Sequence, residues 1–89
     1  MISLHVYFRG RVQGVGFRSF VLGRAREAGL SGWVRNLPDG SVDAVFSGDD
    51  ETVARIVEAC RAAPFPISVR ELESHPAEPP QVSGFHVFA

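Results

Sequence analysis

The sequence contains no lysine, since all nine of its basic residues are arginine. This excludes Schiff-base chemistry on a lysine amine and the nucleoside-triphosphate loop that ends in a lysine. Cys60 is the single cysteine, so the chain has neither an internal disulfide nor a thiolate metal cluster. His5, His75 and His86 are scattered without the spacing of metal ligands. We therefore expect no metal site.

Long hydrophobic runs and an excess of charge are also missing. No apolar run approaches the roughly 18 residues that span a membrane, and the N-terminus lacks the features of an export signal. The net charge of −1 disfavours a general nucleic-acid surface. Eighty-nine residues with 45% hydrophobic content are typical of one small globular domain. We expect a single domain over residues 1–89, a cytoplasmic monomer with no membrane or nucleic-acid partner.

Hydrophobic periodicity predicts the order of the secondary-structure elements. Alternating residues indicate half-buried strands, and apolar stripes at helical spacing indicate two amphipathic helices. Strands are expected over 2–9, 33–37, 42–47, 65–72 and 85–88, and helices over 17–28 and 49–60. The untidy fourth strand favours a bulge, and a proline-rich loop follows over 75–83. This order predicts an α+β fold, a ferredoxin-like βαββαβ sandwich with an antiparallel sheet and two helices packed on one face.

The segment between the first strand and the first helix is rich in glycine and arginine. Three glycines and two arginines fall within residues 10–18. Glycine lets the backbone turn sharply, and N–H groups ahead of a helix N-terminus bind oxyanions. Arg18 adds a planar fork that matches phosphate or carboxylate oxygens. From the residues alone two interpretations stay open: an anion site, or a turn that only lets the helix pack on the sheet. Ser19 replaces the third glycine of a dinucleotide fingerprint, which excludes that motif.

Asn36 lies just ahead of the turn Pro38-Asp39-Gly40. Its amide can accept from one water and donate to it, as the positioning of a hydrolytic water requires. An asparagine at such a place is also typical of local turn stabilisation, so both roles stay open. Arg35 alternates with Asn36, and we expect the two side chains on opposite faces of the sheet.

These two segments resemble the signatures of the acylphosphatase family. The residues that carry the first resemblance are Gly10-x-Val12-Gln13-Gly14-Val15-x-Phe17-Arg18. Those that carry the second are Gly32-Trp33-Val34-Arg35-Asn36, followed by Gly40-x-Val42 and Gly48. The resemblance spans residues 10–48, whereas the C-terminal half is similar only in its order of elements. The chain length resembles that of a free-standing member, and differs from the long hydrogenase-maturation proteins whose N-terminal parts are similar.

The resemblance implies hydrolysis of an acyl phosphate, a small-molecule substrate, to a carboxylate and inorganic phosphate, without metal, cofactor or covalent intermediate. It implies that Arg18 binds the phosphate and that Asn36 orients the attacking water. The phosphate oxygens would be surrounded by the backbone N–H groups of Gln13, Gly14, Val15, Gly16, Phe17 and Arg18.

Two other functions are compatible with parts of the sequence. The first is a non-enzymatic module of the same fold that binds a small anion and needs no water-orienting Asn36. The second is RNA recognition, because residues 14–20 superficially resemble an aromatic RNA-binding motif. That motif belongs on a central strand, whereas Phe17 and Phe20 fall on the predicted core stripe of a helix. The RNA-binding function is therefore disfavoured.

Overall fold

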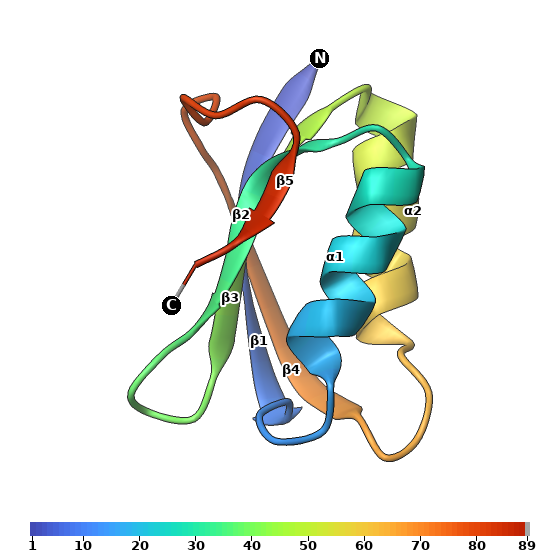
Figure 1. Cartoon of the computed structure of the whole chain (residues 1–89), viewed down its shortest axis with the longest axis vertical. Helices are drawn as coiled ribbons and strands as arrows, with labels where there is room; N and C mark the ends of the chain where they lie inside the picture. The colour runs from blue at the N-terminus through green and yellow to red at the C-terminus, as the bar shows by residue number, and fades with distance from the viewer. Residues whose placement is uncertain (89) are drawn as a thin grey trace.

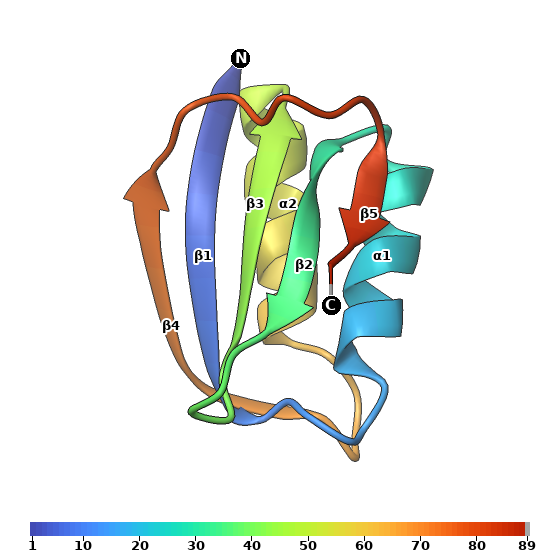
Figure 2. The same cartoon turned by 60° about the vertical axis from the view of Figure 1, so that its left-hand side comes forward.

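Two helices cover one face of a five-stranded sheet in the computed structural model, which describes residues 1–88 (Figure 1). The elements are β1 (Ile2–Arg11), α1 (Phe17–Glu27), β2 (Ser31–Asn36), β3 (Val42–Gly48), α2 (Asp50–Arg61), β4 (Ser68–Pro76) and β5 (Phe85–Val87). The strand order is β4-β1-β3-β2-β5, so β4 and β5 form the two edges (Figure 2). The predicted ferredoxin-like sandwich is confirmed, and β5 adds a fifth strand at one edge of the sheet.

The sheet is mixed, which corrects the expectation of a purely antiparallel sheet. β1 pairs antiparallel with β3 and β4, and β2 pairs antiparallel with β3. β5 runs parallel to β2, with Val34 opposite Val87. The connection between β4 and β5 crosses one end of the sheet, so β5 starts at the end where β2 also starts (Figure 2). Residues 85–88 do not indicate whether this strand pairs parallel or antiparallel with β2, because β2 lies far away along the chain.

β4 begins and ends later than predicted. The expected strand covered 65–72, but the observed strand covers Ser68–Pro76 and takes in the start of the expected proline-rich loop. Most of its side chains are exposed, because it is an edge strand, and this removes the alternation on which the prediction depended. The expected bulge is present: Arg9 lies opposite Glu71 and Gly10 opposite Val69, which leaves Arg70 as the extra residue.

The hydrophobic core lies between the sheet and the two helices. Phe8 of β1 and Phe17, the first residue of α1, are almost fully buried, and their rings meet edge to face with centroids 5.0 Å apart. This contact holds the start of α1 against the end of β1, where the glycine-rich turn lies. Cys60 is fully buried in the same core, and burial raises the pKa of its thiol to about 12. The cysteine is therefore a core residue.

The other face of the sheet carries a buried carboxylate beside the second signature. Asp43 of β3 is fully buried and accepts hydrogen bonds from Arg35 Nε at 2.8 Å and from Arg35 Nη2 at 3.1 Å. The Nε2 atom of His5 lies 2.8 Å from the second carboxylate oxygen. The hydrogen bond to Asp43 raises the pKa of Arg35. This network joins β1, β2 and β3, and it places Arg35 on the face opposite the helices, as expected.

No helix within residues 1–88 has the length and apolar character needed to span a membrane.

Candidate active site

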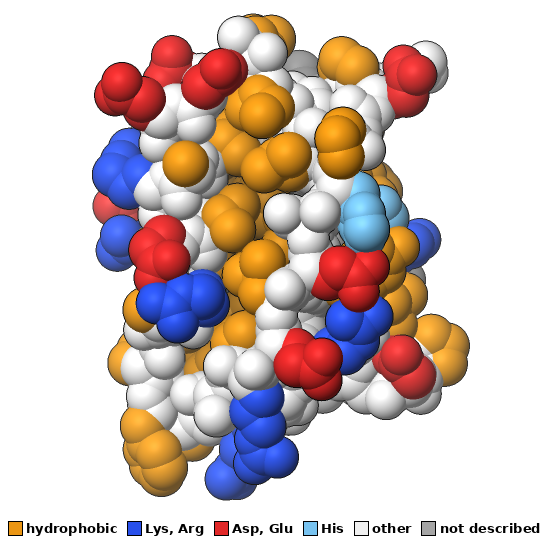
Figure 3. All heavy atoms as spheres, turned by 180° about the vertical axis from the view of Figure 1, so that it is seen from behind, with side chains coloured by type: hydrophobic (Ala, Val, Ile, Leu, Met, Phe, Trp, Pro, Cys, Tyr) orange, Lys and Arg blue, Asp and Glu red, His pale blue; other side chains and the backbone are white. Residues whose placement is uncertain are grey.

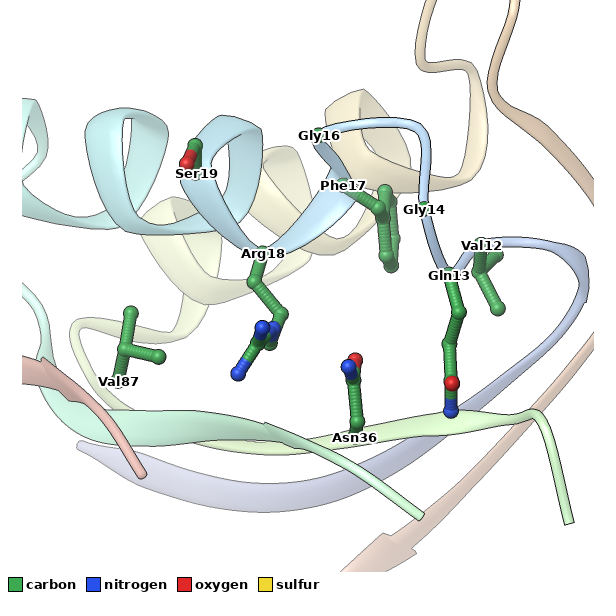
Figure 4. Close-up of a pocket in the computed structure, with 9 residues that line it drawn as sticks. All are labelled: Val12, Gln13, Gly14, Gly16, Phe17, Arg18, Ser19, Asn36 and Val87. Atoms are coloured by element: carbon green, nitrogen blue, oxygen red, sulfur yellow. The ribbon is translucent and has the colours of Figure 1, made fainter. Parts of the chain in front are cut away.

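A pocket of about 250 Å³ opens between the N-terminus of α1 and the end of β2 (Figure 4). It brings Arg18 of α1 beside Asn36 of β2, although the two belong to different signatures of the sequence. The lining residues are Val12, Gln13, Gly14, Gly16, Phe17, Arg18, Ser19, Asn36 and Val87. Every predicted site residue except Val15 is among them.

The turn that forms one wall of the pocket requires glycine for its backbone conformation. Gly14 has φ +73° and Gly16 has φ +81°, in the left-handed region that other residues rarely adopt. A Cβ atom at either position would meet no other atom within 4 Å. The constraint is therefore torsional. None of the N–H groups from Gln13 to Ser19 donates a hydrogen bond to another backbone carbonyl within residues 1–88.

The N-termini of the two helices differ in their capping and acidic residues. At α2, Asp49 accepts a hydrogen bond from the Thr52 N–H, and the first turn contains Asp50 and Glu51. At α1, the first turn contains no acidic residue, and Gly16 offers no side chain as a cap. The partial positive charge at the start of α1 therefore has no counter-charge from its own residues, which is the condition for binding an anion.

Arg18 adds a full positive charge to this end of α1. Within residues 1–88, its side chain takes part in no ion pair or hydrogen bond. Among the described residues that line the pocket, Arg18 is the one with a charged side chain. Arginine side chains also lie at the bottom end of the molecule in Figure 3, the end where Figure 1 places the turn, although carboxylates are present on both halves of that face. This end suits an anionic ligand.

The side chain of Asn36 points into the pocket toward Arg18 (Figure 4). Its Oδ1 atom is buried and has no hydrogen-bond partner within residues 1–88. The turn-stabilising role is held by Asp39, which accepts a hydrogen bond from the Ser41 N–H at 2.9 Å. Hydrogen bonds from Ser41 lower the pKa of Asp39. The amide of Asn36 is thus left available to a ligand in the pocket, which favours the functional interpretation over the turn role.

Three features of the pocket differ from what the sequence led us to expect. Val15 is not among the lining residues, because it is partly buried and packs against the hydrophobic core; the expected role of its backbone N–H group stays a prediction. Val87 of β5 lines the pocket although no signal singled it out, because its place depends on the parallel pairing with β2. The Gln13 side chain points toward the hairpin β2–β3 (Figure 4), whereas only its backbone N–H group was considered.

Ligands for a metal ion do not gather in the pocket. Within residues 1–88, no three His, Cys, Asp or Glu side chains are grouped so that they could hold a metal ion. His5 is engaged with Asp43, His75 contacts Glu73, and His86 contacts the Ser83 carbonyl. The positive charge of the pocket comes from Arg18 and the backbone amides.

Replacing Gly16 by alanine should both destabilise the protein and weaken its binding of inorganic phosphate. An alanine at φ +81° costs about 1 kcal/mol, and relief of that strain would turn the neighbouring N–H groups away from the pocket. Urea unfolding and calorimetric titration with phosphate measure the two effects. Gly23→Ala is the matched control, because Gly23 is an exposed residue inside α1 with an ordinary φ. That variant should keep phosphate binding; equal weakening in both variants would contradict the role of Gly16.

Comparison with known proteins assigns a family. The acylphosphatase family model matches residues 4–87. The acylphosphatase of Azorhizobium caulinodans is 48% identical over 88 residues, which cover 98% of this chain and 95% of the relative. The acylphosphatase of Trichormus variabilis is 46% identical over 87 residues, which cover 98% of this chain and 86% of the relative. These similarities extend through the C-terminal half, beyond the two signatures.

The three-dimensional structure leads to the same family. The crystal structure of an acylphosphatase from Bacillus subtilis matches with a TM-score of 0.92 and 30% sequence identity, and the match covers 100% of both chains. The structure of an acylphosphatase from Coxiella burnetii matches with a TM-score of 0.90 and 32% identity, covering 98% of this chain and 92% of the other.

Proposed function

The chain belongs to the acylphosphatase family, and from this premise we propose how its residues hydrolyse acyl phosphates to a carboxylate and inorganic phosphate. The observation that carries the proposal is the meeting of three features at one pocket: the unpaired N–H groups of the turn, the Arg18 guanidinium and the unpartnered Asn36 amide oxygen. No finding favours the non-enzymatic alternative.

The phosphoryl group of the substrate is bound by the turn and by Arg18. The N–H groups from Gln13 to Arg18 donate to the non-bridging phosphate oxygens, and Arg18 donates two parallel hydrogen bonds through its planar fork. These donors are fixed by the fold, so little reorganisation is needed when charge develops in the transition state. Arg18 and the amides supply the positive charge that a metal ion supplies in other phosphoryl-transfer enzymes, and we propose a metal-independent reaction on this basis.

Asn36 orients the attacking water. Its Oδ1 atom accepts a hydrogen bond from the water, which leaves an oxygen lone pair directed at phosphorus. The new bond forms between the water oxygen and phosphorus, while the bond between phosphorus and the acyl oxygen breaks and its electron pair leaves with the carboxylate. The water proton passes to a phosphate oxygen. A carboxylate is a weakly basic leaving group, so the reaction needs no strong general acid.

Hydrolysis of benzoyl phosphate with and without a metal chelator tests this proposal. We expect saturable turnover at an unchanged rate in the presence of the chelator, with competitive inhibition by inorganic phosphate. Loss of activity on chelation would overturn the metal-independent mechanism. Saturable binding of phosphate without any turnover would instead support the non-enzymatic alternative.

Several expectations about the whole protein stay predictions. We propose one acylphosphatase domain over residues 1–89 that acts as a monomer in the cytoplasm on a small-molecule acyl phosphate. Analytical ultracentrifugation tests the oligomeric state directly.

A further inference from the structure

The side chain of Gln13 joins the two halves of the active site. Its Nε2 atom donates hydrogen bonds to the carbonyl oxygens of Leu37 at 2.8 Å and of Ser41 at 2.9 Å. These carbonyls also close the tip of the hairpin β2–β3, since Ser41 O accepts from the Leu37 N–H and Leu37 O accepts from the Gly40 N–H. One amide nitrogen thus uses both of its protons to hold the two ends of the tip.

No backbone pairing connects the turn to this hairpin tip. The ladder between β1 and β3 ends at Phe8 and Val42, and the ladder between β2 and β3 ends at Asn36 and Val42. Beyond those pairs, the hydrogen bonds that link residues 12–18 with residues 37–41 in the described chain are the two from Gln13. Within residues 1–88, the direct hydrogen bonds between the two segments therefore come from one side chain.

Each segment carries one part of the proposed chemistry. Gln13 directly precedes Gly14 in the turn proposed to bind the phosphoryl group, and Leu37 directly follows Asn36, which is proposed to orient the water. Figure 4 shows the Gln13 side chain reaching the hairpin beside Asn36. A displacement of about 1 Å between reacting groups can cost about a hundredfold in rate. The hydrogen bonds of Gln13 therefore link the segment proposed to bind the phosphorus atom to the segment proposed to hold the attacking water.

We propose that Gln13 is a positioning residue, whose side chain clamps the phosphate-binding turn to the hairpin and so aligns the water held by Asn36 with the bound phosphorus. This inference rests on the proposed function of Arg18 and Asn36. It assigns to the Gln13 side chain a role separate from that of its backbone N–H group.

The first test compares turnover with phosphate binding. Gln13→Ala should lower kcat by at least about tenfold, whereas the inhibition constant of inorganic phosphate should stay within about twofold, because Arg18 and the turn amides remain. Gln13→Glu keeps the shape of the side chain but removes the N–H donors, so it should lower kcat at neutral pH as well. Gln81→Ala is the matched control, because Gln81 is exposed in the connection between β4 and β5; its kcat should be unchanged.

A double-mutant cycle separates positioning from a merely structural role. If Gln13 acts through Asn36, then Gln13→Ala should cause no further loss of kcat in a protein that already contains Asn36→Ala. A full additional loss in that background would overturn the proposal, as would a Gln13→Ala protein with lowered stability but unchanged kcat. Failure of the proposed function has a different signature: Asn36→Ala by itself would leave kcat unchanged.

Discussion

Replacing Arg18 by alanine should lower kcat/KM for benzoyl phosphate by about a thousandfold, since loss of one oriented donor to a developing oxyanion costs between about 10² and 10³ and here a full charge is lost too. Within residues 1–88, Arg18 is the one charged side chain that lines the pocket, and no acidic residue neutralises it. KM and the inhibition constant of phosphate should both rise, because in the proposed mechanism the guanidinium contacts the phosphoryl group before and during the reaction.

The conservative variant and a matched arginine sharpen this test. Arg18→Lys keeps the charge but loses the planar fork, so it should recover only a small part of the activity. Arg24→Ala removes an exposed arginine farther along the same helix, outside the pocket. It should leave kcat/KM nearly unchanged. Near-normal kinetics of Arg18→Ala would remove this residue from the mechanism, and an equal loss in Arg24→Ala would point to a general effect of charge.

Replacing Asn36 by alanine should lower kcat by about 10² to 10³ while the inhibition constant of phosphate changes little. The reason is that Asn36 Oδ1 contacts the water in this mechanism, whereas the phosphate is bound by the turn and Arg18. This split between kcat and phosphate binding distinguishes Asn36 from Arg18. Steady-state kinetics with benzoyl phosphate, combined with phosphate inhibition, measure both quantities on the same samples.

Two further variants on the same hairpin complete that experiment. Asp39→Asn lies outside the pocket lining and keeps an amide oxygen that can accept from the Ser41 N–H, so its kcat should be close to that of the wild type. Asn36→Asp introduces a negative charge beside the phosphate site and should weaken phosphate binding as well as turnover. A parallel decline of phosphate inhibition and kcat in Asn36→Ala would contradict a role confined to the water.

Local features of the sequence predicted most of the fold because they report local physics. Alternation in residues 2–9 reflects a strand with one face in the core, and the turn signal Pro38-Asp39-Gly40 marks the hairpin whose second strand, β3, is buried over residues 42–47; both strands are present with small shifts of their ends. The prediction was wrong for the bounds of β4 and for the direction of β5, because both depend on the position of the strand in the sheet. β4 is an edge strand with mostly exposed side chains, so its pattern was weak and its bounds moved to Ser68–Pro76. The direction of β5 is set by its partner β2.

The sequence carried a clear local signal for some residues of the site and none for others. The glycines of the turn carry a local signal, because left-handed backbone at Gly14 and Gly16 requires that residue type. Asn36 had two open roles, and the resemblance to a family implied the water-orienting one, which stays a prediction. The structure supplies a physical reason: Asp39 takes the turn contact and leaves the Asn36 amide free. Gln13 was included for its backbone, and its side-chain contacts could not be read from a single segment.

The sequence by itself determined the helices, the strands in the core, the glycine-rich turn and the absence of lysine and thiolate chemistry, because these follow from residue type and from periodicity along the chain. Only the tertiary structure decided that Arg18 meets Asn36, that Val87 closes one side of the pocket, and that Gln13 reaches the hairpin tip. Such contacts join residues far apart in the chain. They arise from the way the sheet and helices pack, and no local pattern of residues records them.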